Sequence, residues 1–125
     1  VRAIASSLSG HVVELSFAQR ELVHATAAVS LNFPVHLLAR AQALLQSNDI
    51  DPTILGPSFR VMAEKASAME ASEALTGPAR RGDLGTIHHH LDRLTQDPEL
   101  RAAYALLSSM ILRAYGHPDH DNKDV

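Results

Sequence analysis

Polar side chains that can form hydrogen bonds interrupt an otherwise apolar segment, residues 17–46. Asn32, His36 and Arg40 follow one another at intervals of four residues, so they form one stripe if the segment is helical. His24 would lie about 80° from Asn32 on the same helix and would border the same groove. This stripe could line a ligand cleft beside the proline of the same segment. The alternative is a stripe that faces solvent or a subunit interface.

Two adjacent arginines, Arg80 and Arg81, occur in a loop that has Gly77-Pro78 near one end and Gly82 near the other. Beside the start of a helix they could hold an anion such as a carboxylate or a phosphate. The alternative is a pair of solvated arginines. Arg81, Gly82 and Asp83 also match a cell-adhesion tripeptide, which we interpret as coincidence. The physical interpretation is that Gly82 makes a turn and Asp83 caps the next helix.

The remaining residues that could do chemistry do not form a recognisable catalytic site. His88, His89 and His90 are consecutive, and on a helix they would point about 100° apart, so they cannot converge on one metal ion. We expect no metal site. The chain has no cysteine and no Gly-x-Gly-x-x-Gly fingerprint for a dinucleotide. By itself the chain is not expected to be a stand-alone enzyme.

Residues 17–46 must form the main structural element, a helix of about 45 Å that is apolar on almost every side. Such a helix is usually buried on every side. Pro34 lies within it and removes one backbone hydrogen bond at a cost of about 3 kcal/mol, which predicts a kink between Ser30 and Pro34. A compact chain of this size is only about 36 Å across, so we expect another domain or subunit to cover the excess apolar surface.

Shorter helices are predicted after Ser47–Asp49 end the long one. Asp51 followed by Pro52 is typical of a helix start, and so is Asp97 followed by Pro98. The second helix is predicted to be interrupted at Gly56–Pro57 and then to continue to about Leu75, where a loop over residues 76–83 follows. Asp83 should cap the next helix, which has Leu84, Ile87, Leu91 and Leu94 on one face. The last helix should end at Gly116.

Composition sets the class of protein. The chain has 125 residues, 46% of them hydrophobic and 4% aromatic, which is one domain rich in helix formers. The net charge of −3 and the scattered basic residues argue against nucleic-acid binding. No apolar run of about 20 residues lacks a charged or strongly polar group, so we expect no membrane span. The lack of cysteine fits a cytoplasmic protein.

The N-terminal residues predict a different kind of structure. Residues 1–9 are typical of the end of a helix stopped by Gly10, and residues 11–16 have the composition of a short strand. A lone strand needs a partner sheet, which the rest of the sequence does not offer. We therefore predict three parts: residues 1–16 as the remnant of an upstream domain, residues 17–116 as a helical domain, and residues 117–125 as a flexible polar tail.

The sequence from Leu75 to Asp83, followed by a helix and then Pro98-Glu99-Leu100, resembles the C-terminal domain of a group of bacterial Rossmann-like proteins. These belong to the 6-phosphogluconate dehydrogenase-like superfamily, near the pyrroline-5-carboxylate and ketopantoate reductases. Arg20, His24 and Asn32 resemble the start of the family's long helix, although Val23 stands where an aromatic residue often precedes the histidine. The resemblance covers roughly residues 10–115.

The resemblance implies an all-α helical bundle around a long kinked helix, like the C-terminal domain of 6-phosphogluconate dehydrogenase. It also implies a preceding Rossmann-like domain that binds NAD(P), no cofactor held by this chain alone, and a homodimer formed through the helical domain. His24, Asn32, Thr76 and Arg81 would then face a substrate cleft. The expected function is the dimerisation and substrate-side half of an NAD(P)-dependent oxidoreductase. The alternative is a non-enzymatic helical module that binds a partner protein.

Overall fold

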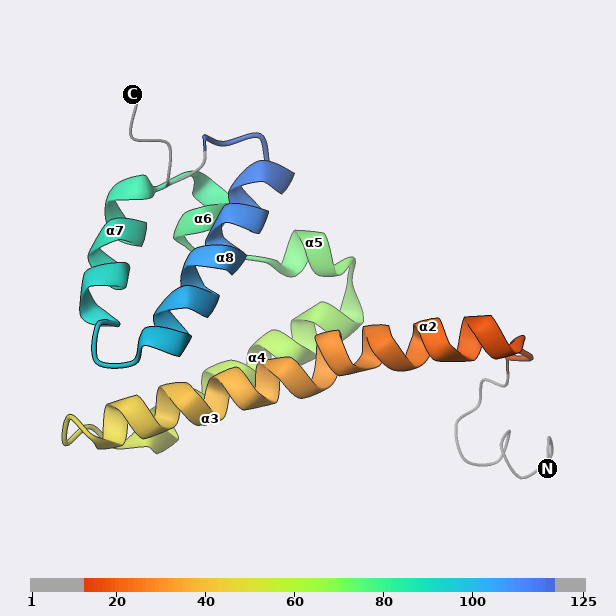
Figure 1. Cartoon of the computed structure of the whole chain (residues 1–125), viewed down its shortest axis with the longest axis horizontal. Helices are drawn as coiled ribbons and strands as arrows, with labels where there is room; N and C mark the ends of the chain where they lie inside the picture. The colour runs from red at the N-terminus through yellow and green to blue at the C-terminus, as the bar shows by residue number, and fades with distance from the viewer. Residues whose placement is uncertain (1–12, 119–125) are drawn as a thin grey trace. The chain divides into compact units, whose positions relative to one another are not determined.

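The computed structural model describes residues 13–118, and over that range the chain is helical and has no β-strand (Figure 1). The all-α class predicted from the sequence is confirmed. The chain divides into two compact units, residues 1–36 and residues 37–125. Each unit is considered by itself below. The predicted N-terminal helix lies outside the described residues.

The first unit contains helix α2 (Phe17–Ala27), the π-helical turn η1 (Ala28–Asn32) and the first residues of helix α3 (Phe33–Gln46). A capping box starts α2: the hydroxyl of Ser16 accepts from the backbone N–H of Gln19, whose side chain accepts from the backbone N–H of Ser16. Residues 13–16, the described part of the predicted strand, are not in a strand, because no neighbouring strand in the described chain pairs with them.

A π turn precedes Pro34, in the region where the sequence predicted a kink. The backbone N–H of Phe33 donates to the carbonyl of Ala28, five residues earlier, instead of the carbonyl four residues earlier. This bonding ends at Phe33, because Pro34 has no N–H to continue it. The hydroxyl of Ser30 donates to the carbonyl of Thr26 at 2.8 Å and so satisfies a backbone acceptor just before the turn. The helix therefore departs from regular α geometry in the region where the sequence predicted a kink, and the kink itself stays a prediction.

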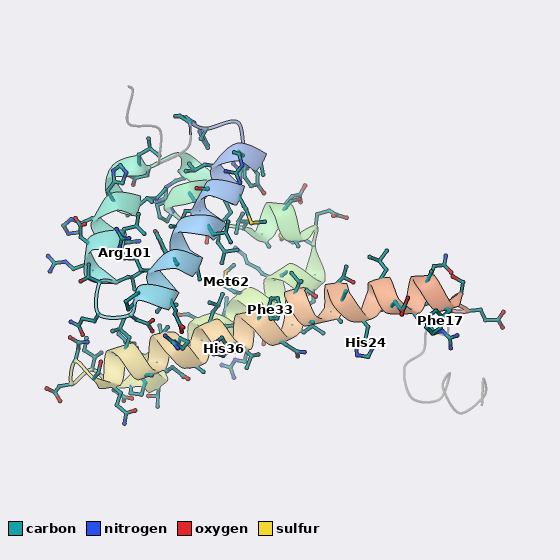
Figure 2. All side chains as sticks on the ribbon, viewed as in Figure 1. Phe17, His24, Phe33, His36, Met62 and Arg101 are labelled. Carbon is teal, nitrogen blue, oxygen red and sulfur yellow. The ribbon has the colours of Figure 1, made fainter. Side chains whose placement is uncertain are left out.

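The burial predicted for this long helix is absent in the single chain. None of the residues of α2, η1 or α3 is buried. Phe17 and Phe33 (Figure 2) are among its exposed apolar residues. By length and composition alone, Phe17–Gln46 could cross a membrane, although the core helix of a soluble protein passes the same test. Within the described residues of the first unit, the apolar surface of α2 and η1 is therefore left uncovered.

The second unit begins within α3 and contains all the remaining helices. In chain order these are the 3₁₀ turn η2 (Pro52–Ile54), α4 (Leu55–Ala68), α5 (Ala71–Ala74), α6 (Pro78–Arg81), α7 (Leu84–Arg93) and α8 (Pro98–Ala114).

Aspartates cap three of these elements, as the sequence predicted. The carboxylates of Asp51, Asp83 and Asp97 accept hydrogen bonds from the backbone N–H groups of Thr53, Thr86 and Leu100, respectively. At the other end of α8, Gly116 adopts a φ of 72°, and the N–H of His117 donates to the carbonyl of Leu112 at 2.9 Å. This is a Schellman ending, in which the left-handed residue after a helix turns the chain away.

Three boundaries differ from the prediction. Gly56 and Pro57 do not interrupt a helix; they lie in the first turn of α4, where the missing N–H of a proline has no helical partner to lose. The helix predicted to reach Leu75 ends at Ala68, and the short helix α5 follows separately. The predicted loop over residues 76–83 contains the single helical turn α6, which begins at Pro78.

The core of the second unit lies between α6, α7 and α8, which pack on one another (Figure 1). Ala79, Ile87, Leu91 and Leu112 are buried there, and Leu84, Tyr104, Ala105 and Ile111 pack around them. Ile87 and Leu91 belong to the apolar face predicted for α7 and are confirmed as core residues. This core holds α6 in place, and α6 carries the two adjacent arginines.

Candidate functional site

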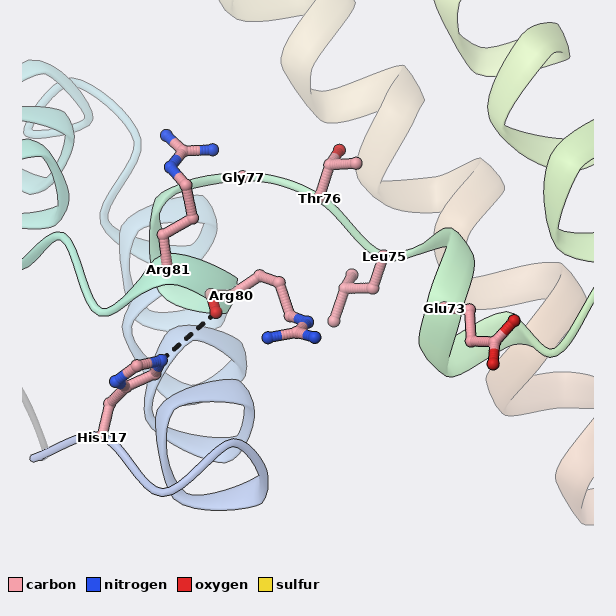
Figure 3. A pocket seen from close by; sticks show the side chains of 7 residues that line it. All are labelled: Glu73, Leu75, Thr76, Gly77, Arg80, Arg81 and His117. Atoms are coloured by element: carbon pink, nitrogen blue, oxygen red, sulfur yellow. Dashed lines mark hydrogen bonds between the residues drawn. The ribbon is translucent and has the colours of Figure 1, made fainter.

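A pocket of about 460 Å³ lies where the segment between α5 and α6 faces the end of α8 (Figure 3). Its lining comes from two parts of the sequence that are far apart. The residues that line it are Glu73, Leu75, Thr76, Gly77, Arg80, Arg81 and His117. Two of these, Thr76 and Arg81, were predicted from the sequence as cleft residues.

The backbone of this segment depends on two glycines. Gly77 has a φ of 103° and directly precedes Pro78, the first residue of α6. Gly82 has a φ of 71° and ends α6. Positive φ angles favour glycine because it has no Cβ. A Cβ on Gly82 would in addition lie 2.6 Å from Nδ1 of His117, so the imidazole packs directly on this glycine.

An aromatic contact holds the side chain of Arg80. Its guanidinium carbon lies 3.8 Å from the centroid of the Tyr115 ring, which is a close cation–π geometry. The hydroxyl of Tyr115 donates to the backbone carbonyl of Ser72 at 2.7 Å. The ring is thus held at both its face and its hydroxyl end, and it offers the guanidinium a flat surface.

His117 closes another side of the pocket. Its Nε2 lies 3.3 Å from the backbone carbonyl oxygen of Arg80, a hydrogen bond that forms when Nε2 carries the proton (Figure 3). The Schellman ending of α8 directs the chain towards this position. His117 is half-buried, although it is the first residue of the tail predicted from the sequence. Residues 119–125 of that predicted tail lie outside the described range.

The two arginines differ in their electrostatic surroundings. Arg81 acts on Asp83, whose carboxylate accepts from the backbone N–H and the hydroxyl of Thr86 at 3.0 and 2.7 Å. These hydrogen bonds are the main reason why the pKa of Asp83 is lowered, and the charge of Arg81 lowers that pKa further. Among the described residues, Arg80 has no ion pair with a carboxylate. Within residues 13–118, its guanidinium contacts the face of Tyr115.

The arginines and Thr76 do not all point the same way. Figure 3 shows Thr76 and Arg81 extending to one side of the segment between them, whereas the guanidinium of Arg80 extends towards Leu75. The carboxylate of Glu73 is directed away from that guanidinium. Chemically, the pocket offers a fixed guanidinium with free N–H groups, which can bind an oxyanion through two parallel hydrogen bonds.

The other two predicted cleft residues, His24 and Asn32, belong to the first unit. His24 is an exposed residue of α2, and Asn32 is the exposed last residue of η1. A π turn has more residues than an α turn, so each residue advances by less than about 100°. The turn therefore reduces the offset of about 80° expected between His24 and Asn32 and brings them nearer to one face. Their role in a cleft stays a prediction.

The consecutive histidines take part in a different contact. Nδ1 of His90 lies 2.8 Å from the hydroxyl oxygen of Tyr104, and the two rings meet edge to face. The pKa of Tyr104 is raised, mainly because the side chain is partly buried. Within residues 13–118, no group of three histidine, cysteine or acidic side chains is placed to hold a metal ion.

A second pocket of about 330 Å³ lies between the end of α3 and the start of α8. It is lined by Arg40, Ala43, Leu44, Ser47, Gln96, Asp97 and Pro98. Arg40 forms ion pairs with Asp97 and Glu99, so the one cation of this pocket is already bound to carboxylates. It is a weaker candidate for ligand binding.

Residues 1–111 match a family described as a domain of unknown function (DUF2520). Among solved structures, the chain is similar to a crystal structure from Bacteroides fragilis that is described as a "putative NADP oxidoreductase". The two chains are 36% identical, with a TM-score of 0.79; the match covers 90% of this chain and 43% of the Bacteroides chain. No curated protein matches this chain.

Proposed function

This chain belongs to the DUF2520 family of domains of unknown function, and on that premise we propose that it is the helical, substrate-side half of an NAD(P)-dependent oxidoreductase. The observation that carries the proposal is the 36% identity to the Bacteroides protein over 90% of this chain, since that protein is described as a "putative NADP oxidoreductase". The family resemblance drawn from the loop between Leu75 and Asp83 agrees with it.

The nucleotide-binding part of the proposed enzyme would be a Rossmann-like domain that precedes this chain. This chain spans 43% of the length of the Bacteroides protein. Its sequence has no Gly-x-Gly-x-x-Gly, and residues 13–118 contain no strand from which such a turn could start. Residues 13–118 therefore do not fit a dinucleotide site of their own, and we propose that the 125-residue chain is not catalytically competent alone.

Two measurements test this proposal. The reading frame upstream of Val1 should encode Gly-x-Gly-x-x-Gly immediately after a predicted strand. A protein that includes this upstream segment should quench or enhance NADPH fluorescence on binding, whereas the 125-residue chain should not. An upstream frame without the fingerprint, together with no binding of NADPH or NADH, would rule out an oxidoreductase role.

We further propose that the enzyme is a homodimer formed through the helical domain. The support is the uncovered apolar surface of α2, η1 and α3. Its large exposed residues are Phe17, Leu22, Val23, Val29, Leu31, Phe33 and Val35. Leu31 is 65% exposed, so Leu31→Asp should not disturb a core of the single chain. In size-exclusion chromatography with light scattering at micromolar concentration, the wild type should be a dimer and Leu31→Asp a monomer. A monomeric wild type would contradict the dimer.

The same apolar surface supports a second candidate function, a non-enzymatic helical module that binds a partner protein through that surface. The upstream reading frame separates the two candidates, since the module requires no dinucleotide domain. For either candidate we propose a cytoplasmic protein that binds neither nucleic acid nor membrane, as expected from the charge and from the polar residues within the long helix.

A further inference from the structure

We propose that the pocket between α5, α6 and the end of α8 is a carboxylate-binding subsite, and that Arg80, not Arg81, is the residue that binds the carboxylate. That the carboxylate belongs to the substrate depends on the proposed function. The binding of a carboxylate by this pocket does not.

The first argument is the way in which Arg80 is held. A free arginine side chain loses much rotamer freedom when it binds a ligand. Here the guanidinium already stacks on Tyr115 at 3.8 Å, and the Tyr115 hydroxyl is bonded to Ser72. Stacking uses the face of the guanidinium and leaves the N–H groups at its edge available. Such an edge matches the two oxygens of a carboxylate.

The second argument is charge. Arg80 has no ion pair with a carboxylate in the described part of the chain, whereas the charge of Arg81 already acts on Asp83. Glu73 also lines the pocket, but its carboxylate is directed away from the guanidinium of Arg80 (Figure 3). With Arg81 engaged by Asp83, the single charge of Arg80 is the one that the lining offers to a ligand, and it suits a singly charged carboxylate better than a doubly charged phosphate.

The third argument is size and composition. The volume of about 460 Å³ is within the range of roughly 300–1,000 Å³ typical of small-molecule sites. His117 supplies a further polar side chain and Leu75 an apolar wall, whereas the hydroxyl of Thr76 lies on the side of Arg81. A small organic acid therefore finds a cation, a polar side chain and an apolar contact within one pocket.

The test is a titration of the 125-residue chain with sodium acetate, followed by NMR of the backbone amides and the arginine Nε–H groups. Sodium chloride keeps the ionic strength constant. The Nε–H of Arg80 and the amides of Thr76 and Gly77 should shift and saturate. In Arg80→Gln the affinity should fall about tenfold or more, equivalent to roughly 1.4 kcal/mol. Arg80→Lys retains the charge but lacks the flat fork, so it should bind several-fold more weakly.

The controls separate the alternatives. Arg93→Gln, on α7 outside the pocket, should bind acetate like the wild type, and each variant's amide spectrum reports whether it is folded. If Arg80→Gln binds like the wild type, or if only Arg81→Gln loses binding, the assignment to Arg80 is wrong. Tighter binding of sodium phosphate than of acetate would overturn the carboxylate class, and shifts that never saturate would overturn the site itself. Because no nucleotide is present, none of these failures is a failure of the oxidoreductase proposal, which NADPH binding tests separately.

Discussion

The guanidinium of Arg40 and the carboxylate of Asp97 form a two-point ion pair between α3 and the start of α8. Nε of Arg40 donates to Oδ2 of Asp97 at 3.0 Å, and a second N–H donates to Oδ1. The same Oδ1 accepts from the backbone N–H of Leu100 at 3.0 Å. One carboxylate therefore both caps α8 and connects it to α3. Protonation of Asp97 would weaken the cap and the ion pair together.

Asp97 should make the stability of the second unit dependent on pH. The hydrogen bond from Arg40 is the main cause that lowers the pKa of Asp97 in the folded chain. A carboxylate with a lowered folded pKa contributes stability above its unfolded pKa of about 3.9, and this contribution disappears as the pH falls through the folded pKa. In urea unfolding monitored by circular dichroism, Asp97→Asn should be less stable than the wild type near neutral pH and should lose less stability on acidification. Asp92→Asn, the same change at an exposed residue of α7, is the control variant.

The buried residues of α7 and α8 should dominate the stability of the second unit. Ile87 and Leu112 have no exposed surface, whereas Leu106 on α8 is 61% exposed. Ile87→Ala or Leu112→Ala should lower the free energy of unfolding by about 2–5 kcal/mol, because each leaves a cavity. Leu106→Ala is the matched control and should change it by less than roughly 1 kcal/mol. Equal effects of all three in chemical denaturation would contradict the assigned core.

Gly82 should not tolerate a side chain. Its φ of 71° and the contact of a built Cβ with His117 both oppose alanine. Gly82→Ala should destabilise by roughly 1–2 kcal/mol from the left-handed backbone alone, and by more if His117 cannot move. Gly85→Ala, on α7 with only an ordinary contact at 3.8 Å, should be neutral or stabilise by about 0.5–1 kcal/mol. In thermal melts, Gly82→Ala should lower the melting temperature, whereas Gly85→Ala should leave it unchanged or raise it.

Replacing Asp49 with glycine should increase the stability of the second unit. It ends α3 with a φ of 58°, and the N–H of Ile50 donates to the carbonyl of Leu45 as in a Schellman ending. A residue with a Cβ is strained there, so Asp49→Gly should raise the free energy of unfolding by roughly 0.5–1 kcal/mol. Asp49→Ala removes the carboxylate but keeps the Cβ, and it should not stabilise. If alanine stabilises as much as glycine, the cause is charge and not backbone strain.

The helix starts could be predicted from the sequence because capping is local. Asp83 and Asp97 find their backbone partners three residues away, so residue type and spacing suffice. The interruption predicted at Gly56–Pro57 was wrong. Proline is compatible with the first turn of a helix, so its position within the helix decides whether it breaks the helix. The break between α4 and α5 left no comparable signal.

The candidate pocket could be predicted only in part. Thr76 and Arg81 were cleft candidates through the family resemblance, but Tyr115 and His117 were not, because their contacts join segments far apart in the sequence. Only the packing of α8 on α6 brings the ring of Tyr115 over Arg80 and His117 onto Gly82. The nearest sequence signal was Gly116, which predicts a chain reversal but not what lies opposite.

The π turn at Ala28–Asn32 gives the chain a sensitivity to length at one place. A turn that closes over five residues instead of four holds one residue more than a regular helix would. Removing a single residue there would let the turn close as a regular α turn, because four α residues advance about as far around the helix axis as five π residues. His24 and the exposed apolar residues of α2 would then keep their face. A further inserted residue could not be absorbed in this way and would turn the residues before it by about 100°. The five residues should therefore tolerate a deletion much better than an insertion.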